Sequence, residues 1–85
     1  MTHIEIYTKN LCVFCDRAKN FFQSRNLNFN EYNVFLNPAY LDLMLKRSNG
    51  QRTMPQIFIN NQHIGGFDDL KKIINNGEFE TMINS

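Results

Sequence analysis

Cys12 and Cys15 are the only two cysteines of this 85-residue chain, and two residues separate them. Residues 3–7 before them alternate between polar and apolar side chains, which predicts a β-strand, and residues 12–22 carry an apolar stripe of helical period. The N-terminus of a helix carries about half a positive charge and free N–H groups, so a thiol there is shifted toward its nucleophilic thiolate. The fold is therefore expected to be organised around a strand that delivers a thiol pair to a helix N-terminus.

Lys9 lies three residues before Cys12 and adds a second positive influence on that thiol. The helix dipole favours the thiolate by about 1 to 2 kcal/mol and a nearby cation by about 1 kcal/mol more, so we expect Cys12 to titrate near neutrality instead of near about 8.5. Cys12 should lie at the exposed start of the helix, whereas Cys15 should lie one turn inside and be less ionised. Cys12 is thus the candidate attacking thiol and Cys15 the resolving thiol.

Three other interpretations of the cysteine pair compete with a redox function. A disulfide that closes so short a loop contributes about 2 kcal/mol, against about 4.7 kcal/mol for a hundred-residue loop, so a stabilising bridge would join more distant segments. A zinc site needs two further ligands and only His3 and His63 are on offer, so no metal is expected. Lys9 and the helix-opening position argue against inert thiols without excluding them. A CxxC segment beside a strand–helix–strand pattern favours a thioredoxin-like redox motif.

Length and charge narrow the function further. A chain of 85 residues is expected to form one domain, residues 1–85, and its net charge of +1 gives little support for nucleic-acid binding. Nothing at the N-terminus resembles a signal peptide and no apolar run approaches a membrane span, so we expect a soluble, cytoplasmic protein. In a reducing cytosol a lone CxxC pair is more plausibly catalytic than structural.

The rest of the chain divides into further strands and helices at its turn and cap signals. His63 falls in one of the strands without a partner in the sequence and is expected to be a surface or satisfied core residue, not a catalytic one. In chain order we expect an edge strand at 29–34, a helix begun by Asn37-Pro38 and ended by Asn49-Gly50, hairpin strands at 56–59 and 62–64 joined by Asn60-Asn61, a helix capped by Asp68 and ended by Asn76-Gly77, and a short helix at 78–83.

Two short segments have the properties of a ligand site. Pro55 forces Met54 toward an extended backbone, whose N–H and C=O groups can pair with a peptide-like ligand, although a structural turn explains the spacing equally well. Gly65-Gly66 allows close backbone approach, and the N–H groups at the helix start near Asp68 can hold a carboxylate while the aspartate holds an ammonium.

The order of these elements, with CVFC, TMPQIF and GGFDDL at matching separations, resembles a glutaredoxin of the dithiol class nearly from end to end. The resemblance implies an α/β thioredoxin fold, with a four-stranded mixed sheet in the order 2-1-3-4 flanked by helices on both faces, and a cis peptide before Pro55. It also implies glutathione as co-substrate. Carried over by position, the catalytic residues are Cys12 and Cys15, and the glutathione-binding residues are Lys9, Phe14, Thr53, Met54, Pro55, Gly66, Phe67 and Asp68.

The chain departs from the usual pattern of that family in two places. The common CPYC is CVFC here, so Phe14 keeps a ring without a hydroxyl, and Val13 restores a backbone N–H that proline lacks. The reduction potential is therefore expected to deviate from the about −200 to −230 mV typical of glutaredoxins. The segment before Arg52 also looks one residue longer than in common members.

The resemblance and the thiol pair together predict a monomeric, glutathione-dependent thiol-disulfide oxidoreductase. Its partners would be glutathione and disulfide-containing or glutathionylated proteins, with ribonucleotide reductase among the candidates. The alternative is an iron-sulfur carrier, because some glutaredoxins hold a [2Fe-2S] cluster between two protomers through the first cysteine and glutathione. Losing the motif proline removes one obstacle to that function.

Overall fold

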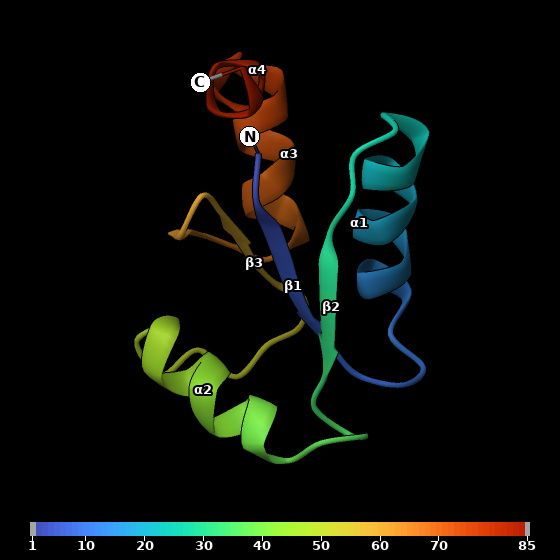
Figure 1. The fold of residues 1–85 in the computed structure, drawn as a ribbon, viewed down its shortest axis with the longest axis vertical. Helices are drawn as coiled ribbons and strands as arrows, with labels where there is room; N and C mark the ends of the chain where they lie inside the picture. The colour runs from blue at the N-terminus through green and yellow to red at the C-terminus, as the bar shows by residue number, and fades with distance from the viewer. Residues whose placement is uncertain (1, 85) are drawn as a thin grey trace.

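The computed structural model describes residues 2–84 and contains every strand and helix that the sequence predicts, in the expected order (Figure 1). None of the helices within 2–84 is long and apolar enough to cross a membrane. The elements are β1 (Ile4–Thr8), α1 (Val13–Ser24), β2 (Asn30–Asn33), α2 (Ala39–Arg47), β3 (Gln56–Ile59), β4 (Gln62–Gly65), α3 (Phe67–Asn75) and α4 (Glu78–Ile83).

The strands form one mixed sheet in the order β2-β1-β3-β4, which confirms the expected topology. β1 runs parallel to β2, with α1 as the crossover between them, and antiparallel to β3; β3 and β4 form the antiparallel hairpin. The polar strand β2 lies at an edge, as its composition predicts. Because β1 is a central strand, the short loop after Thr8 places the N-terminus of α1 at the middle of one end of the sheet.

Alternation along β1 divides the core into two clusters, one on each face of the sheet. Ile4 and Ile6 point to the face covered by α1, α3 and α4, whereas Tyr7 points to the face covered by α2 (Figure 1). The buried residues of the first cluster are Ile4, Ile6, Ala18, Phe22, Ile57, Ile59, Leu70 and Phe79. Those of the second are Tyr7, Val34, Met44 and Phe58.

A partly buried ion pair attaches α2 to the sheet. Arg47 donates to both carboxylate oxygens of Glu5, at 2.8 and 3.1 Å, and to the hydroxyl of Tyr7 at 3.0 Å. Its guanidinium carbon lies 4.0 Å from the ring centroid of Phe58. Burial by itself raises the pKa of Glu5, but the hydrogen bonds and charge of Arg47 outweigh that effect, so the pKa of Glu5 lies below its ordinary value.

The turn between β3 and β4 confirms its sequence signal, since Asn60 and Asn61 both have positive φ, at 52° and 66°. The expected N-cap of α3 is wrong. Asp68 is not the N-cap residue, because the helix begins at Phe67 and Gly66 occupies the cap position. Asp69 lies three residues after the cap, and its Oδ2 accepts the N–H of Gly66 at 3.0 Å.

Candidate active site

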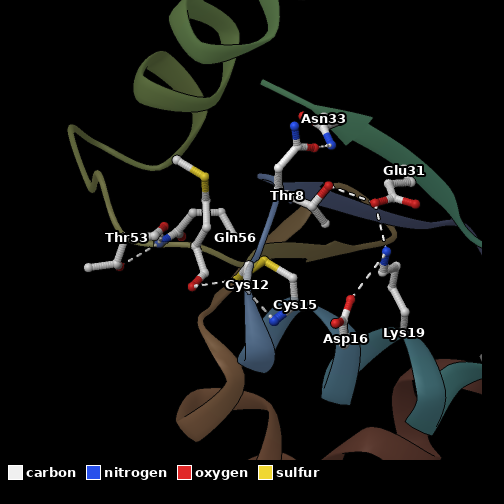
Figure 2. Close-up of a disulfide and its surroundings, with 11 residues drawn as sticks. Thr8, Cys12, Cys15, Asp16, Lys19, Glu31, Asn33, Thr53 and Gln56 are labelled. Carbon is white, nitrogen blue, oxygen red and sulfur yellow. Dashed lines mark hydrogen bonds and ion pairs between the residues drawn. A yellow bond between two sulfur atoms is a disulfide. The ribbon is translucent and has the colours of Figure 1, made fainter. Parts of the chain in front are cut away.

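The two cysteines form a disulfide at the N-terminus of α1 (Figure 2). Cys12 is the N-cap residue, and its Sγ accepts the N–H of Cys15 at 3.2 Å, so the sulfur occupies the position of a capping oxygen. Cys15 is 1% exposed, which confirms that it is the more buried thiol. Cys12 is only 8% exposed, and the expectation of an exposed sulfur is wrong because the disulfide and the nearby Met54 carbonyl enclose it.

Polar contacts to β2 hold the segment that carries the cysteines. Asn33 donates to the side-chain oxygen of Asn10 at 2.9 Å, which fixes the loop before Cys12. Also from β2, the Glu31 carboxylate accepts from the hydroxyl of Thr8 at 2.7 Å and from Lys19 Nζ at 2.9 Å (Figure 2). α1 is thereby tied to the end of β1 and to the edge strand.

A pocket of about 260 Å³ lies beside the disulfide. Seven of the eight residues that the family resemblance assigns to glutathione line it, and Lys9 is the exception. The lining residues are Phe14, Gln51, Thr53, Met54, Pro55, Gly66, Phe67, Asp68 and Asp69. Segments far apart in sequence therefore meet where a ligand can approach the thiols.

Met54 connects the pocket to the sulfur atoms. The peptide bond between Met54 and Pro55 is cis, as the resemblance implies, and the Met54 carbonyl oxygen lies 3.8 Å from Cys12 Sγ (Figure 2). A Cβ placed on Gly66 would lie 3.6 Å from the carbonyl oxygen of Pro55, so the two walls of the pocket approach each other closely here. A ligand sulfur bound alongside Met54 would therefore lie next to Cys12.

Two aromatic rings flank the pocket. The rings of Phe14 and Phe67 are stacked with their centroids 6.0 Å apart. Arg17 lies 5.4 Å from the centroid of Phe14, and Lys71 lies 5.6 Å from that of Phe67. Each ring thus has a cation beside it, while the carboxylates of Asp68 and Asp69 line the pocket itself.

Three residues differ in position from the sequence expectation. Lys9 is exposed, and within residues 2–84 it has no hydrogen bond or ion pair. Gln51 and Asp69 line the pocket although the sequence did not single them out. The extra residue before Arg52 was the available signal for Gln51, because a longer segment changes which side chain faces the pocket. Within the same range no group of three or more His, Cys, Asp or Glu side chains is placed to hold a metal ion.

A thiol pair at the start of the first helix, next to a cis-proline segment at the same end of a 2-1-3-4 sheet, defines a thiol-disulfide oxidoreductase of the thioredoxin fold. Residues 4–64 match the glutaredoxin family model, and the chain belongs to the glutaredoxin family. It is 43% identical over 83 residues to glutaredoxin 3 of Escherichia coli strain K12, an alignment that covers 98% of this chain and 99% of the relative.

Solved structures agree with this assignment. The solution structure of glutaredoxin from Brucella melitensis has a TM-score of 0.78 and 37% identity, with 95% of this chain and 87% of that one covered. The crystal structure of a buckwheat glutaredoxin–glutathione complex has a TM-score of 0.84 and 26% identity, with 95% and 76% covered.

Proposed function

We propose that this protein is a glutathione-dependent oxidoreductase that reduces glutathione mixed disulfides and protein disulfides through Cys12 and Cys15. The observation that carries the proposal is the position of the disulfide beside the Met54 carbonyl, at the edge of a pocket large enough for part of a tripeptide. The family membership and the glutathione complex of the buckwheat relative support glutathione as the ligand.

Reduction of a mixed disulfide needs only the first cysteine. The Cys12 thiolate attacks the glutathione sulfur of the mixed disulfide, a Cys12–glutathione disulfide forms, and the substrate leaves as a thiolate that takes up a proton. The thiolate of a second glutathione then attacks the bound glutathione sulfur. This step releases oxidised glutathione and returns Cys12 as a thiolate, ready for another cycle.

Reduction of a protein disulfide uses both cysteines. Cys12 opens the substrate disulfide and forms a protein adduct, and the Cys15 thiolate then attacks Cys12 Sγ to release the substrate as a dithiol. The two electrons pass to the substrate, and the enzyme is left with the Cys12–Cys15 disulfide, the state that the structure describes. Two glutathione molecules restore the dithiol.

The pocket suggests how glutathione lies during these steps. The Met54 backbone, flanked by Thr53 and Pro55, would pair with the cysteinyl residue of glutathione in the manner of a β-strand. The γ-glutamyl end would reach Gly66, Phe67 and Asp68 at the start of α3, where free N–H groups favour a carboxylate and Asp68 favours an ammonium. Phe14 would pack on the ligand from α1, and Lys9 would face the glycyl carboxylate.

The proposed reaction predicts steady turnover of a small glutathione mixed disulfide, such as that of 2-hydroxyethanethiol, in an assay coupled to glutathione reductase and NADPH. The initial rate should be proportional to protein concentration and saturate with the mixed disulfide. The same protein after alkylation of its thiols serves as the control. A rate no higher than that of the alkylated protein would contradict the proposed function.

The position of Cys12 also predicts a thiolate at neutral pH in the reduced protein. Its Sγ faces the helix N-terminus and accepts the Cys15 N–H, so thiolate absorbance should rise with a midpoint well below about 8.5. Lys9→Glu should raise that midpoint by about 0.5 to 1 pH unit and weaken glutathione binding, because it reverses a charge facing both anions.

Lys46→Glu is the matched control for this measurement, because it changes the net charge equally from an exposed position on α2. It should leave the midpoint in place. A midpoint near about 8.5 in the unmodified protein would mean that the dipole and lysine arguments fail. Equal effects of the two substitutions would remove Lys9 from the proposed site.

Several finer expectations remain proposals. These are a single domain over residues 1–85, a cytoplasmic location, a monomeric state, and ribonucleotide reductase among the protein substrates. Neither the site nor the relatives add an observation that favours the iron-sulfur carrier, so that function is not proposed.

A further inference from the structure

A fully buried amide lies directly behind the pocket, on the face of the sheet that α2 covers. Gln56, the first residue of β3, is 0% exposed. Its Nε2 lies 2.9 Å from the carbonyl oxygen of Thr53 and 3.2 Å from the Thr53 hydroxyl (Figure 2). Its Oε1 lies 2.7 Å from Nε2 of His63 on β4. A continuous chain of hydrogen bonds thus runs from His63 to a residue that lines the pocket.

The chemistry of the groups fixes the direction of this chain. A carbonyl oxygen only accepts, so the NH₂ end of the Gln56 amide must face Thr53, and the amide oxygen must face His63. That oxygen also only accepts, so Nε2 of His63 must carry a hydrogen. The Thr53 carbonyl therefore fixes the orientation of the buried amide, and that orientation requires a hydrogen on Nε2 of His63.

The surroundings of His63 keep its ring in place and uncharged. The ring lies 4.9 Å from the centroid of Phe58, on the neighbouring strand. Burial lowers the pKa of His63 below its ordinary value; the charge of Asp69 opposes this shift and that of Arg47 adds to it. At neutral pH the ring is thus a neutral donor from Nε2, and protonation would occur at the other nitrogen.

We propose that His63 is a positioning residue of the active site, which acts through the amide of Gln56 to hold the Thr53–Met54–Pro55 wall of the pocket. The inference rests on the proposed function, since it assigns to His63 a part in binding the glutathione moiety. The segment between α2 and β3 has no regular secondary structure; a backbone hydrogen bond holds Gly50 and Met54 packs on the second core cluster, so Thr53 depends on side-chain hydrogen bonds. The hydrogen bonds from Gln56 are the ones that reach Thr53.

Loss of the His63 hydrogen has a specific consequence for this wall. The amide oxygen of Gln56 would be buried without a donor, and the amide could satisfy it only by turning away or by rotating. Rotation would put two acceptors against each other at the Thr53 carbonyl. Either response moves Thr53, and with it the neighbouring Met54 carbonyl that faces Cys12.

The test compares His63→Leu with His63→Gln in the purified full chain. Leucine removes the donor, whereas the side-chain nitrogen of glutamine lies about as far from Cα as Nε2 of histidine and can donate in its place. His63→Leu should raise KM for the small glutathione mixed disulfide by about fivefold or more and change kcat by less than about twofold. His63→Gln should retain most of the original KM.

NMR spectra supply a readout that needs no activity and keep this inference separate from the proposed function. In the unmodified protein the imidazole ¹⁵N shifts of His63 should show hydrogen on Nε2, and His63→Leu should shift the amide signals of Thr53 and Met54. His3→Leu, at the only other histidine, should leave those signals unchanged. Three results would each overturn the inference. The first is an Nε2 of His63 that carries no hydrogen, and the second is a KM of His63→Gln as high as that of His63→Leu. The third is a His63→Leu protein whose Thr53 amide signals and KM are both unchanged.

Discussion

Replacing Cys12 by serine should abolish reduction of both substrate classes, with a loss of at least about a thousandfold. Every proposed reaction begins with a thiolate at this position, and a serine hydroxyl is far too weakly acidic to replace it. Cys15 cannot take over the attack, because it is 1% exposed and lies inside the first turn of α1. The measurement is the coupled assay with a small mixed disulfide and, separately, with a disulfide-bonded protein.

Cys15→Ser is the matched variant. It should keep the reduction of mixed disulfides and lose most of the reduction of protein disulfides. A glutathione adduct on Cys12 can still be discharged by a second glutathione, so reduction of the mixed disulfide should stay within about threefold of the original rate. Protein disulfides need a resolving thiol close to the adduct, since otherwise the substrate's own thiol recloses the bond. That activity should fall by about tenfold or more.

Folding must be checked separately because Cys15→Ser buries a hydroxyl. Cys15→Ala avoids that hydroxyl and should show the same separation of activities, and thermal unfolding of each variant identifies any loss of structure. The mechanism is wrong if Cys12→Ser stays active while both Cys15 variants lose everything.

Arg47→Met should cost about 2 to 4 kcal/mol in the free energy of unfolding. The substitution leaves the Glu5 carboxylate largely buried without its arginine partner, with His3 at 3.5 Å as the remaining ion-pair neighbour, and removes the guanidinium from the ring of Phe58. Lys46→Met makes the same change of side chain at an exposed neighbour on α2 and should be close to neutral. Urea unfolding of the oxidised proteins measures both, and similar losses in the two variants would show that the ion pair contributes little.

The pH dependence of the free energy of unfolding gives a second test of the ion pair between Glu5 and Arg47. The folded-state pKa of Glu5 lies below the ordinary value of 4.5, so its stabilisation is present above that value and is lost as the pH falls through the lowered pKa. The stability difference between the original protein and Arg47→Met should therefore shrink on acidification from about pH 7 to about pH 3. Addition of Glu5→Gln to the variant should recover part of the stability at neutral pH, because no unpaired charge then remains.

The sequence predicted most of the fold because its signals are local. Alternation in β1, the apolar stripe of α1 and the paired asparagines of the hairpin each report on a few neighbouring residues, and each is confirmed. The cap of α3 was misassigned by two residues for the same reason, because Gly66 and not Asp68 is the N-cap. Adjacent aspartates both suit a helix start, and the choice between them depends on the turn at Gly65, whose φ is 117°.

The sequence predicted less of the site where the site depends on contacts between residues far apart in the chain. The irregular segment before Pro55 has no period, so its one signal for Gln51, the extra residue before Arg52, does not say which side chain faces the pocket. The contact between Gln56 and His63 depends on the register of β3 against β4, and that register shifts between Ile57 and Phe58. The one sign in the sequence was Gln56 itself, a polar residue at the start of the apolar strand β3, which needs a hydrogen-bond partner if it is buried.

α2 is the one described helix that covers its face of the sheet, so the smaller of the two core clusters depends on this helix alone for its cover (Figure 1). Release of α2 would uncover Tyr7 and Phe58 while the layer of α1, α3 and α4 keeps its own core. The thiols belong to the layer of α1, α3 and α4. Thr53 and Met54 belong to the irregular segment that leads from α2 to β3. The pocket therefore takes its walls from two layers, with Phe14, Gly66 and Phe67 from one and Thr53 and Met54 from the segment that follows α2.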